Sequence, residues 1–491
     1  MLAIAFDRGT LVVRAQALPE ELLQGLGFVP DGRTGGWRAP ALAYRELILR
    51  LRNNAIPYQD QARAYEKFPL ESCLERIPFP YQAEALEAWW GARGRGTVVL
   101  PTGAGKTFLA QLVMQKAACS TLVLTPTLDL MQQWYGVLST GFEIEVGLLG
   151  GGYHEPRPVT VCTYDSAYLH MERLGDRYGL LVFDECHHLP GPSYSMAAET
   201  SLAPFRLGLT ATPERQDGED WRLERLVGPI IYRREITELA GEYLAEYETE
   251  RLRVRLSQEE REKYLEERAI YRAFVQGNQL QLGRPGGWAR FLMLTSRSEA
   301  GRRAFLAYRN QKRIAEASGA KLRLLGRLLE RHRRDRVLIF TGDNHTVYRI
   351  SQQFLIPAIT HQTKIKERHD FLQGFNRGDY PFLVTSKVLN EGVDVPAANV
   401  GIVLSGSGSV REHVQRLGRI LRRGKDKRAL LYEVVAEDTA EEFVSSRRRR
   451  HQAYGGEGPT AEEPGAAEAV DGEAEEDPRG TEATEETHVD Q

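Results

Sequence analysis

The chain contains few cysteines and no long apolar run. Of its 491 residues only four are cysteines, and they form neither a C-x-x-C pair nor a zinc-ligand spacing; they are Cys73, Cys119, Cys162 and Cys186. We therefore expect reduced thiols, as in a cytoplasmic protein, and neither disulfides nor structural zinc. No 18-residue apolar run occurs, and the N-terminus lacks a basic leader, so neither a membrane span nor a signal peptide is expected.

Lysine is scarce beside arginine, with 11 lysines and 53 arginines. Guanidinium groups suit phosphate contacts, although a base-composition bias of the genome explains the excess equally well. The net charge of −3 conceals an asymmetry, because the chain from Glu457 on holds 13 acidic residues and one basic residue, leaving 63 basic and 54 acidic residues before it. A basic body with an acidic tail is typical of nucleic-acid binders.

The tail, residues 455–491, is rich in Gly, Pro, Ala and Glu and has almost no large apolar residues. Such a composition cannot offset the entropy of ordering, so we expect disorder. Its expected role is that of a solubilising tail, with autoinhibition by nucleic-acid mimicry as the alternative.

Short apolar runs alternate with helical stretches in two separate parts of the chain. In residues 75–235 the runs are Thr97–Leu100, Thr121–Thr125, Val159–Thr163, Leu180–Phe183 and Arg206–Leu209. In residues 331–445 they are Val337–Thr341, Phe382–Thr385, Val400–Leu404 and Leu430–Val434. This alternation predicts two α/β domains, each built on a parallel sheet covered on both faces.

Two further segments have a different character. Residues 1–70 combine a hairpin pattern, Ala3–Phe6 with Leu11–Ala15, and a helical stretch, which predicts a small α+β domain. Residues 257–330 are helical, rich in arginine and interspersed with aromatics such as Phe291, Phe305 and Tyr308. Cations with aromatics suit single-stranded nucleic acid, but for the aromatics alone we favour packing into a helical core.

A phosphate-binding loop follows the first buried run. Residues 101–107 read Pro-Thr-Gly-Ala-Gly-Lys-Thr and precede a helical stretch, Phe108–Ala118. Glycines let backbone N–H groups turn toward phosphate oxygens, Lys106 supplies a positive charge, and Thr107 offers a hydroxyl to Mg²⁺. The loop predicts binding of a nucleoside triphosphate through residues Thr102, Gly103, Ala104, Gly105, Lys106 and Thr107. A Gly-rich turn without ligand is the alternative, and Leu100 stands where the first glycine is usual.

Two carboxylates end the run Leu180–Phe183. Asp184 and Glu185 lie where parallel strands place ligands, at the carboxyl end of the sheet. We expect Asp184 to hold Mg²⁺ and Glu185 to orient or deprotonate the attacking water. We expect His187, two residues on, to couple the nucleotide site to the rest of the domain.

Gln82 and an arginine-rich segment complete the candidate nucleotide site. Gln82 follows aromatic residues at a helix start, where it could read adenine; an ordinary helix start explains it equally well. The segment Gln415–Arg422 carries arginines at every third position, on one helical face. We interpret Arg419 and Arg422 as fingers that stabilise charge on the γ-phosphate, rather than as a solvated basic helix.

Seven motifs occur in the order typical of helicase superfamily two. They are Pro101–Thr107, Thr125–Thr127, Thr163–Tyr164, Asp184–His187, Thr210–Thr212, Asn390–Asp394 and Gln415–Arg422. The chain resembles the XPB group within that superfamily, especially its archaeal and bacterial members, over residues 75–445.

The resemblance implies a 3′–5′ DNA-dependent ATPase with two RecA-like domains, at 75–235 and 240–445. It implies a damage-recognition domain at 1–70 and a thumb-like helical insertion at about 257–320. The Arg-Glu-Asp element of the family stands here as Arg215-Gln216-Asp217, without the middle carboxylate. The motifs assign Asp394 to the nucleotide and Thr127, Thr163, Arg215 and Asp217 to the nucleic acid.

From these residues we expect a cytoplasmic, monomeric enzyme that uses ATP and Mg²⁺ to move on or unwind single-stranded or forked DNA in nucleotide excision repair. A nuclease partner is implied by the resemblance alone. Three alternatives stay open at this point: the motor subunit of a restriction or defence system, an RNA helicase, and an ATP-gated DNA-binding module that never unwinds, which the altered Gln216 motivates.

Overall fold

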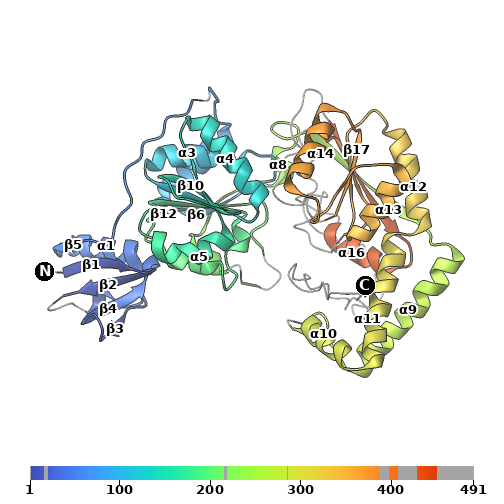
Figure 1. Cartoon of the computed structure of the whole chain (residues 1–491), viewed down its shortest axis with the longest axis horizontal. Helices are drawn as coiled ribbons and strands as arrows, with labels where there is room; N and C mark the ends of the chain where they lie inside the picture. Colours follow the sequence, from blue (N-terminus) through green and yellow to red (C-terminus); the bar gives the residue numbers. More distant parts are fainter. Residues whose placement is uncertain are drawn as a thin grey trace, which may run out of the picture.

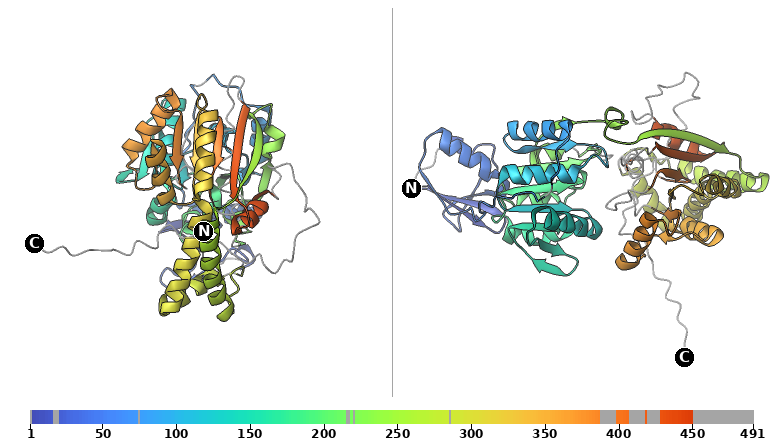
Figure 2. Two further views of the ribbon diagram at one scale, coloured as in Figure 1. Left: turned by 90° about the vertical axis from the view of Figure 1, so that its right-hand side faces the viewer. Right: turned by 90° about the horizontal axis from the view of Figure 1, so that it is seen from above.

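The computed structural model describes residues 2–15, 20–73, 75–214, 218–219, 221–284, 286–386, 398–406, 418 and 428–449. Three β-sheets follow one another along the long axis of the molecule, and a group of helices projects from the third unit (Figures 1 and 2). The fold class predicted from the sequence, two parallel-sheet domains with a small N-terminal domain and a helical insertion, is confirmed.

The N-terminal sheet is small and mostly antiparallel. Its strands are β1 (Leu2–Asp7), β2 (Thr10–Arg14), β3 (Val29–Asp31), β4 (Gly36–Pro40) and β5 (Tyr58–Asp60), in the order β3-β4-β2-β1-β5. The short helices η1 (Glu20–Leu22) and η2 (Ala41–Ala43) and the helix α1 (Tyr44–Asn53) accompany it. The predicted hairpin is present as the antiparallel pair β1–β2.

This N-terminal unit shares its apolar core with the domain that follows. Leu202, which belongs to the next domain, is buried in the same cluster as Ile4 and Leu47. The Arg45 guanidinium also donates a hydrogen bond to the carbonyl of Arg93 (2.6 Å). The two units are therefore packed against each other rather than joined only by the chain.

The first large sheet holds eight strands and is parallel apart from one edge pair. Its strands are β6 (Arg95–Val99), β7 (Thr121–Thr125), β8 (Gly147–Gly150), β9 (Tyr153–Glu155), β10 (Val159–Thr163), β11 (Leu180–Asp184), β12 (Phe205–Thr210) and β13 (Ile230–Arg233), in the order β13-β6-β12-β11-β7-β10-β8-β9. Among the described strands of this sheet, β8 and β9 alone pair antiparallel. All five strands expected between 75 and 235 are present, because fully buried parallel strands are continuous apolar runs.

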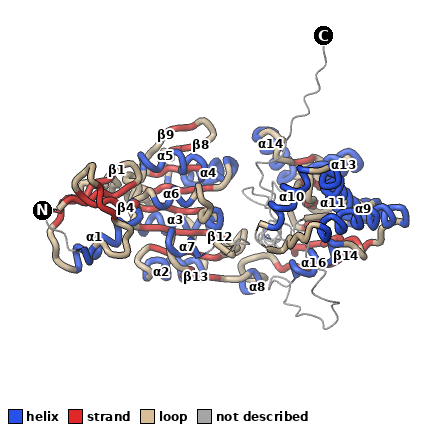
Figure 3. Tube along the Cα trace, turned by 90° about the horizontal axis from the view of Figure 1, so that it is seen from below, coloured by secondary structure: helices blue, strands red, loops and turns tan. Residues whose placement is uncertain are grey.

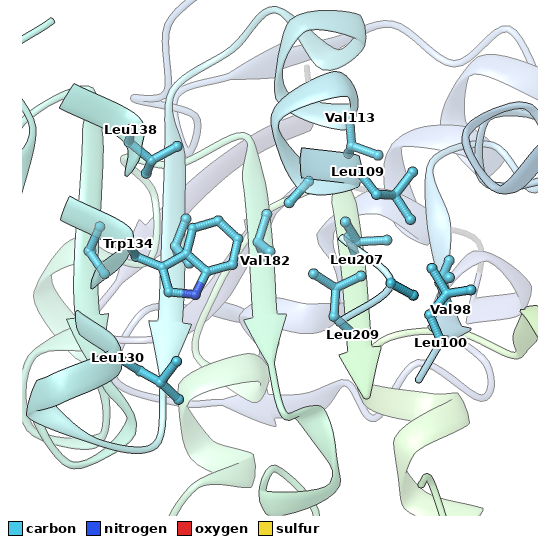
Figure 4. Packing of buried hydrophobic residues seen from close by; sticks show 14 of the residues in the cluster. Val98, Leu100, Leu109, Val113, Leu130, Trp134, Leu138, Val182, Leu207 and Leu209 are labelled. Atoms are coloured by element: carbon cyan, nitrogen blue, oxygen red, sulfur yellow. The ribbon is translucent and has the colours of Figure 1, made fainter. Parts of the chain in front are cut away.

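Helices cover both faces of this sheet. One face packs against α2 (Pro80–Gly91), α3 (Lys106–Ala117) and α4 (Leu128–Phe142). The other packs against α5 (Tyr164–Leu174), α6 (Ser195–Glu199) and α7 (Trp221–Leu226). Figure 4 shows the first of these cores, in which Trp134 of α4 and Leu109 of α3 lie over Val182 and Leu207 of the central strands.

The second large sheet repeats the design with parallel strands throughout. It contains β14 (Glu246–Val254), β15 (Val337–Phe340), β16 (Ala358–Ile359), β17 (Phe382–Thr385), β18 (Val400–Val403) and β19 (Arg428–Ala436), in the order β14-β19-β18-β15-β17-β16. Helices α12 (Gly319–Arg331) and α13 (Asn344–Phe354) pack on one face and α14 (Ile365–Arg377) on the other. The helix α16 (Ala440–Arg449) follows β19, and α8 (Ile236–Leu239) lies between the two domains (Figure 3).

The helical insertion consists of α9 (Gln258–Gly277), α10 (Gly287–Arg297) and α11 (Glu299–Glu316) and projects away from the second sheet (Figure 1). Its aromatics form a core of their own, in which Phe291 is fully buried and stacks near Trp288, with ring centroids 5.0 Å apart. The inward packing favoured from the sequence is thus confirmed. Among the described residues, no helix combines the length and apolar character that crossing a membrane requires.

Candidate nucleotide site

The phosphate-binding loop is positioned between β6 and α3. The buried strand β6 delivers the chain to the loop, and α3 begins at Lys106. Gly103 and Gly105 have φ angles of 90° and 76°, a left-handed conformation that glycine adopts without strain. A Cβ at Gly105 would also lie 2.6 Å from the Gln82 amide nitrogen, so only glycine fits there.

Gln82 and Tyr81, at the start of α2, hold this loop. The fully buried Gln82 side chain donates through Nε2 to the carbonyl of Ala104 (3.2 Å) and accepts from the backbone N–H of Phe79 (3.0 Å). The Tyr81 hydroxyl donates to the same carbonyl of Ala104 (2.8 Å). The amide predicted to read adenine is therefore engaged with the loop backbone, and an adenine contact by Gln82 stays a prediction.

Lys106 points from the loop toward the two carboxylates. Its Nζ lies 3.6 Å from Glu185 Oε1 and donates to the carbonyl of Leu100 (3.4 Å). Both side chains of the ion pair are largely buried. Residues about 80 positions apart in the chain thus meet at the carboxyl edge of one sheet, as the strand–loop–helix pattern predicted.

Asp184, the last residue of β11, is held from two sides. Its Oδ2 accepts a hydrogen bond from Trp134 Nε1 (2.7 Å), and its Oδ1 accepts from the backbone N–H of Glu185 (3.1 Å). Burial disfavours the charged carboxylate, and the adjacent charge of Glu185 adds to this effect, so the pKa of Asp184 is raised to about 6. A cation bound to Asp184 would favour the ionised carboxylate, which is the form that binds the cation.

Glu185 sits in a left-handed backbone conformation, with a φ of 46°, which a residue other than glycine adopts only where its surroundings enforce it. Its Oε1 faces Lys106, while Oε2 is buried without a hydrogen-bond donor among the described residues. His187 Nδ1 lies 3.5 Å from Oε2 and 3.0 Å from the Thr210 hydroxyl. The imidazole therefore connects Glu185 to the end of β12, consistent with the coupling role expected from the sequence.

Thr127 and Thr163 occupy matching positions on neighbouring strands. Each is the N-cap of the helix that follows, with its hydroxyl accepting from the backbone N–H of Leu130 and Ser166 respectively (both 3.2 Å). The two loops that we assigned to nucleic acid therefore lie at the carboxyl ends of β7 and β10, which are adjacent in the sheet.

Several predicted site residues lie outside the described residues, namely Arg215, Asp217, Asp394, Arg419 and Arg422. Gly418, which is described, approaches the phosphate-binding loop so closely that an added Cβ would clash with Thr102. Among the described residues, Gly418 is thus in contact with the loop.

Sequence reasoning missed several contacts around the site. Trp134 and Tyr164 bind Asp184 from α4 and α5, and Asp129 at the start of α4 forms an ion pair with Arg368 of α14 in the second domain. A tryptophan in an apolar helical pattern predicts only core packing. Its hydrogen bond to a residue 50 positions away leaves no signal in a single sequence.

Three sequence families match successive parts of the chain. Residues 4–62 match the xeroderma pigmentosum group B helicase damage recognition domain, residues 76–215 the res subunit of type III restriction enzymes, and residues 303–456 the ERCC3/RAD25/XPB C-terminal helicase. Two of the three matches thus name the same group of helicases, one at each end of the chain.

Individual relatives agree with these matches. A Sulfurisphaera tokodaii protein named DNA 3′-5′ translocase XPB2 is 40% identical over 84% of this chain and 96% of its own length. Proteins named DNA 3′-5′ helicase XPB from Kineococcus radiotolerans and Mycobacterium tuberculosis are 32% and 31% identical over 77% of this chain. The chain spans 63% and 64% of those two bacterial relatives. With this identity and coverage, the chain belongs to the XPB family of helicases.

Proposed function

We propose that this protein is an ATP-driven 3′–5′ motor that moves along DNA or separates its strands during nucleotide excision repair. The observation that carries the proposal is the meeting of Lys106, Asp184 and Glu185 at one edge of a parallel sheet, facing a second domain of the same design. The names of the archaeal and bacterial relatives support the direction of movement and the choice of DNA.

The residues at this edge fit ATP and Mg²⁺. The left-handed glycines turn the backbone of residues 102–105 into a cradle, and the buried Thr102 hydroxyl has no hydrogen-bond partner among the described residues. Lys106 would neutralise the β/γ-phosphates, while the Thr107 hydroxyl and the Asp184 carboxylate would hold Mg²⁺. The ion supplies charge neutralisation between the β- and γ-phosphate oxygens when it is bound.

Glu185 is the proposed general base. Its Oε2 is buried and available to accept a proton from water, while Oε1 is paired with Lys106. Phosphate oxygens compete for the same ammonium group, so nucleotide binding would loosen this ion pair and leave the carboxylate to the attacking water. A shift of the Glu185 side chain would then reach the end of β12, because Glu185 contacts His187 and His187 contacts Thr210.

We assign the remaining roles to residues of both domains. Arg419 and Arg422 would stabilise charge on the γ-phosphate, Asp394 and Gln82 would contact the nucleotide, and closure of the domains would accompany ATP binding. Thr127, Thr163, Arg215 and Asp217 would contact the nucleic acid. The close approach of Gly418 to Thr102 supports a site shared between the domains.

We further propose domain limits of 1–70, 75–235 and 240–445, with the thumb at about 257–320, because each sheet is complete within its range. The working form would be a cytoplasmic monomer on single-stranded or forked DNA, assisted by a nuclease partner. Sedimentation of the purified chain with and without forked DNA tests the monomer.

The decisive experiment compares Lys106→Ala with Lys116→Ala. Both lysines lie on α3, but Lys116 pairs with Glu87 on the surface (3.4 Å), away from the carboxylates. We expect Lys106→Ala to abolish ATP hydrolysis stimulated by single-stranded or forked DNA, with the fold retained, and Lys116→Ala to keep it. Equal turnover in both variants, or stimulation by RNA in preference to DNA, would contradict the proposal.

A further inference from the structure

The indole of Trp134 makes a contact that core packing alone does not require. Its N–H donates to Asp184 Oδ2 at 2.7 Å, and the two side chains are only 1% and 6% exposed. An indole N–H can only donate a hydrogen bond, so it needs an acceptor such as the Asp184 carboxylate. A neighbouring group that only donates cannot take the place of that oxygen. A hydrogen bond to a charged group in a buried setting is also stronger than a neutral one.

The contact restricts how Asp184 can turn. One carboxylate oxygen is held by the indole and the other by the backbone N–H of Glu185 (3.1 Å). The ring itself is wedged between Leu130, Leu138 and Val182, with its nitrogen toward the carboxyl end of the strand (Figure 4). Because the ring cannot reorient within this packing, its N–H moves only when α4 moves.

The helix α4 also carries contacts to other parts of the molecule. It begins after Thr127, the residue that we assigned to nucleic acid. Within its first turn, Asp129 forms an ion pair with Arg368 of the second domain, and the two side chains are 22% and 11% exposed. One rigid element therefore joins the nucleic-acid loop, the second domain and the Asp184 carboxylate.

A second aromatic repeats this arrangement. Tyr164, the residue after Thr163 and the first of α5, donates its hydroxyl to the backbone carbonyl of Asp184 (3.0 Å). Both candidate nucleic-acid loops thus lead into a helix whose aromatic residue holds Asp184, one by its side chain and one by its backbone.

We propose that Trp134 is the positioning residue for Asp184: it sets the orientation of the metal-binding carboxylate and links that orientation to the placement of α4 by DNA and by the second domain. The inference rests on the proposed function, since it assumes that Asp184 holds Mg²⁺. Tyr164 supports the same carboxylate through the backbone.

The test is Trp134→Phe against Trp89→Phe. Each change keeps an aromatic ring and removes one buried N–H donor of the same sheet face; Trp89 donates to the carbonyl of Arg206 (2.9 Å). In the sheet register Arg206 lies beside Leu181, whereas Asp184 lies beside Leu209, so Trp89 binds far from the carboxyl edge. A loss of Mn²⁺ binding common to both variants therefore comes from a weakened domain core. A loss confined to Trp134→Phe comes from the changed orientation of Asp184.

Binding of Mn²⁺ in the presence of ADP, followed by electron paramagnetic resonance of the full-length protein, is the first readout. We expect Trp134→Phe to weaken Mn²⁺ binding about 10-fold, as is usual when a group that orients a metal ligand is removed. Trp89→Phe should bind Mn²⁺ like the wild type, although both variants lose thermal stability. Equal Mn²⁺ affinity in the two variants would overturn the inference.

DNA provides the second readout. In the wild type, forked DNA should tighten Mn²⁺–ADP binding, and in Trp134→Phe this tightening should be lost, with Trp89→Phe retaining it. If Trp134→Phe does not fold, Tyr164→Phe replaces it, and weaker Mn²⁺ binding than in Trp89→Phe supports the inference while equal binding refutes it. A wild type that binds Mn²⁺–ADP but never hydrolyses ATP refutes the proposed function and leaves the positioning role standing.

Discussion

The two large sheets share one architecture, but the side chains at their carboxyl edges differ in chemical type. At the carboxyl edge of the first sheet lie Lys106, Asp184 and Glu185, an ammonium and two carboxylates withdrawn from solvent. The described part of the corresponding edge of the second sheet carries buried hydroxyl groups, at Thr341, Thr385, Ser386 and Ser405. Its buried ammonium, Lys321, is paired with Glu441 and donates to the carbonyl of Leu404, directly after β18.

The hydroxyls of the second edge hold loop backbone. Thr341 donates to the carbonyl of Asp343 (3.0 Å), and Ser405 accepts from the N–H of Gly342 (2.7 Å). Groups that stay neutral and satisfied at pH 7 shape a surface, whereas buried groups whose charge can change perform acid–base chemistry. The comparison agrees with our proposal that hydrolysis takes place at the first sheet, while the hydroxyls of the described second edge shape its loops.

The strongest test of this division replaces Glu185 with Gln. The amide keeps the size of the side chain but cannot take a proton, so we expect kcat for DNA-stimulated ATP hydrolysis to fall by about 10²–10⁴-fold while nucleotide binding persists. Thr341→Val, which removes a hydroxyl from the second edge, should keep most of the turnover. A larger loss in Thr341→Val than in Glu185→Gln would reverse the assignment.

Aromatic residues extend the comparison, because those of the thumb pack together, whereas Trp134 contacts Asp184 at the carboxyl edge of the first sheet. Phe291→Ala removes the fully buried centre of the thumb core and should destabilise the thumb by about 3–5 kcal/mol. Leu292→Ala, at the exposed next residue, should change stability by at most about 0.5 kcal/mol. Denaturation followed by circular dichroism measures both, and ATP hydrolysis without DNA should persist in each variant.

The raised pKa of Asp184 gives the first edge a pH signature. Because the folded protein holds this proton more tightly than the unfolded chain, ionising Asp184 costs stability, and the cost grows as pH rises from about 4 to about 6. Asp184→Asn escapes that cost, so it should be more stable than the wild type at pH 7 by about 1–3 kcal/mol and equal to it near pH 4.

Activity should respond in the opposite direction. At limiting Mg²⁺, ATP hydrolysis by the wild type should decline as pH falls below about 6, because metal-free Asp184 takes up a proton there. Thermal unfolding at a series of pH values, with the exposed Asp379→Asn as control, measures the stability difference. A constant difference between wild type and Asp184→Asn across this range would exclude Asp184 as its source.

The smallest expected effect concerns the ion pair that joins the domains. Asp129 and Arg368 are mostly buried, so a double-mutant cycle with alanine should give a coupling energy of about 1 kcal/mol or more. The pair Glu248–Arg428, 60% and 67% exposed within the second domain, should give less than about 0.5 kcal/mol. Equal couplings would mean that Asp129–Arg368 adds nothing to the contact between the domains.

Much of the fold was predictable because buried parallel strands appear as continuous apolar runs. Thr121–Thr125, Val159–Thr163 and Phe382–Thr385 match β7, β10 and β17 residue for residue. The meeting of Lys106 with Glu185 was also predictable, because a loop after one parallel strand and a carboxylate after another must share an edge of the sheet. The start of α3 at Lys106, two residues before the expected Phe108, reflects the loop geometry around Gly105.

Other features were not readable from the sequence. The hydrogen bond from the Gln82 amide to the loop carbonyl of Ala104 depends on how α2 packs, and no sequence pattern indicated it; the adenine contact stays a prediction. The N-terminal domain was predicted to span residues 1–70, and nothing in the sequence indicated that Leu202 completes the apolar core of that domain. Such contacts join segments whose separation in sequence carries no periodic signal.

The sequence by itself determined the order of the parts: a glycine-rich loop with Lys106, a strand ending in two carboxylates, and two alternations of strands and helices. Local pattern suffices for these because backbone geometry and burial act within a few residues. Only the tertiary structure decided which aromatic side chain holds Asp184 and which helix of the first domain forms an ion pair with the second. These contacts depend on packing between segments that are distant in the sequence. A single hydrogen bond between such segments contributes little stability until the surrounding core fixes the direction of its donor and acceptor.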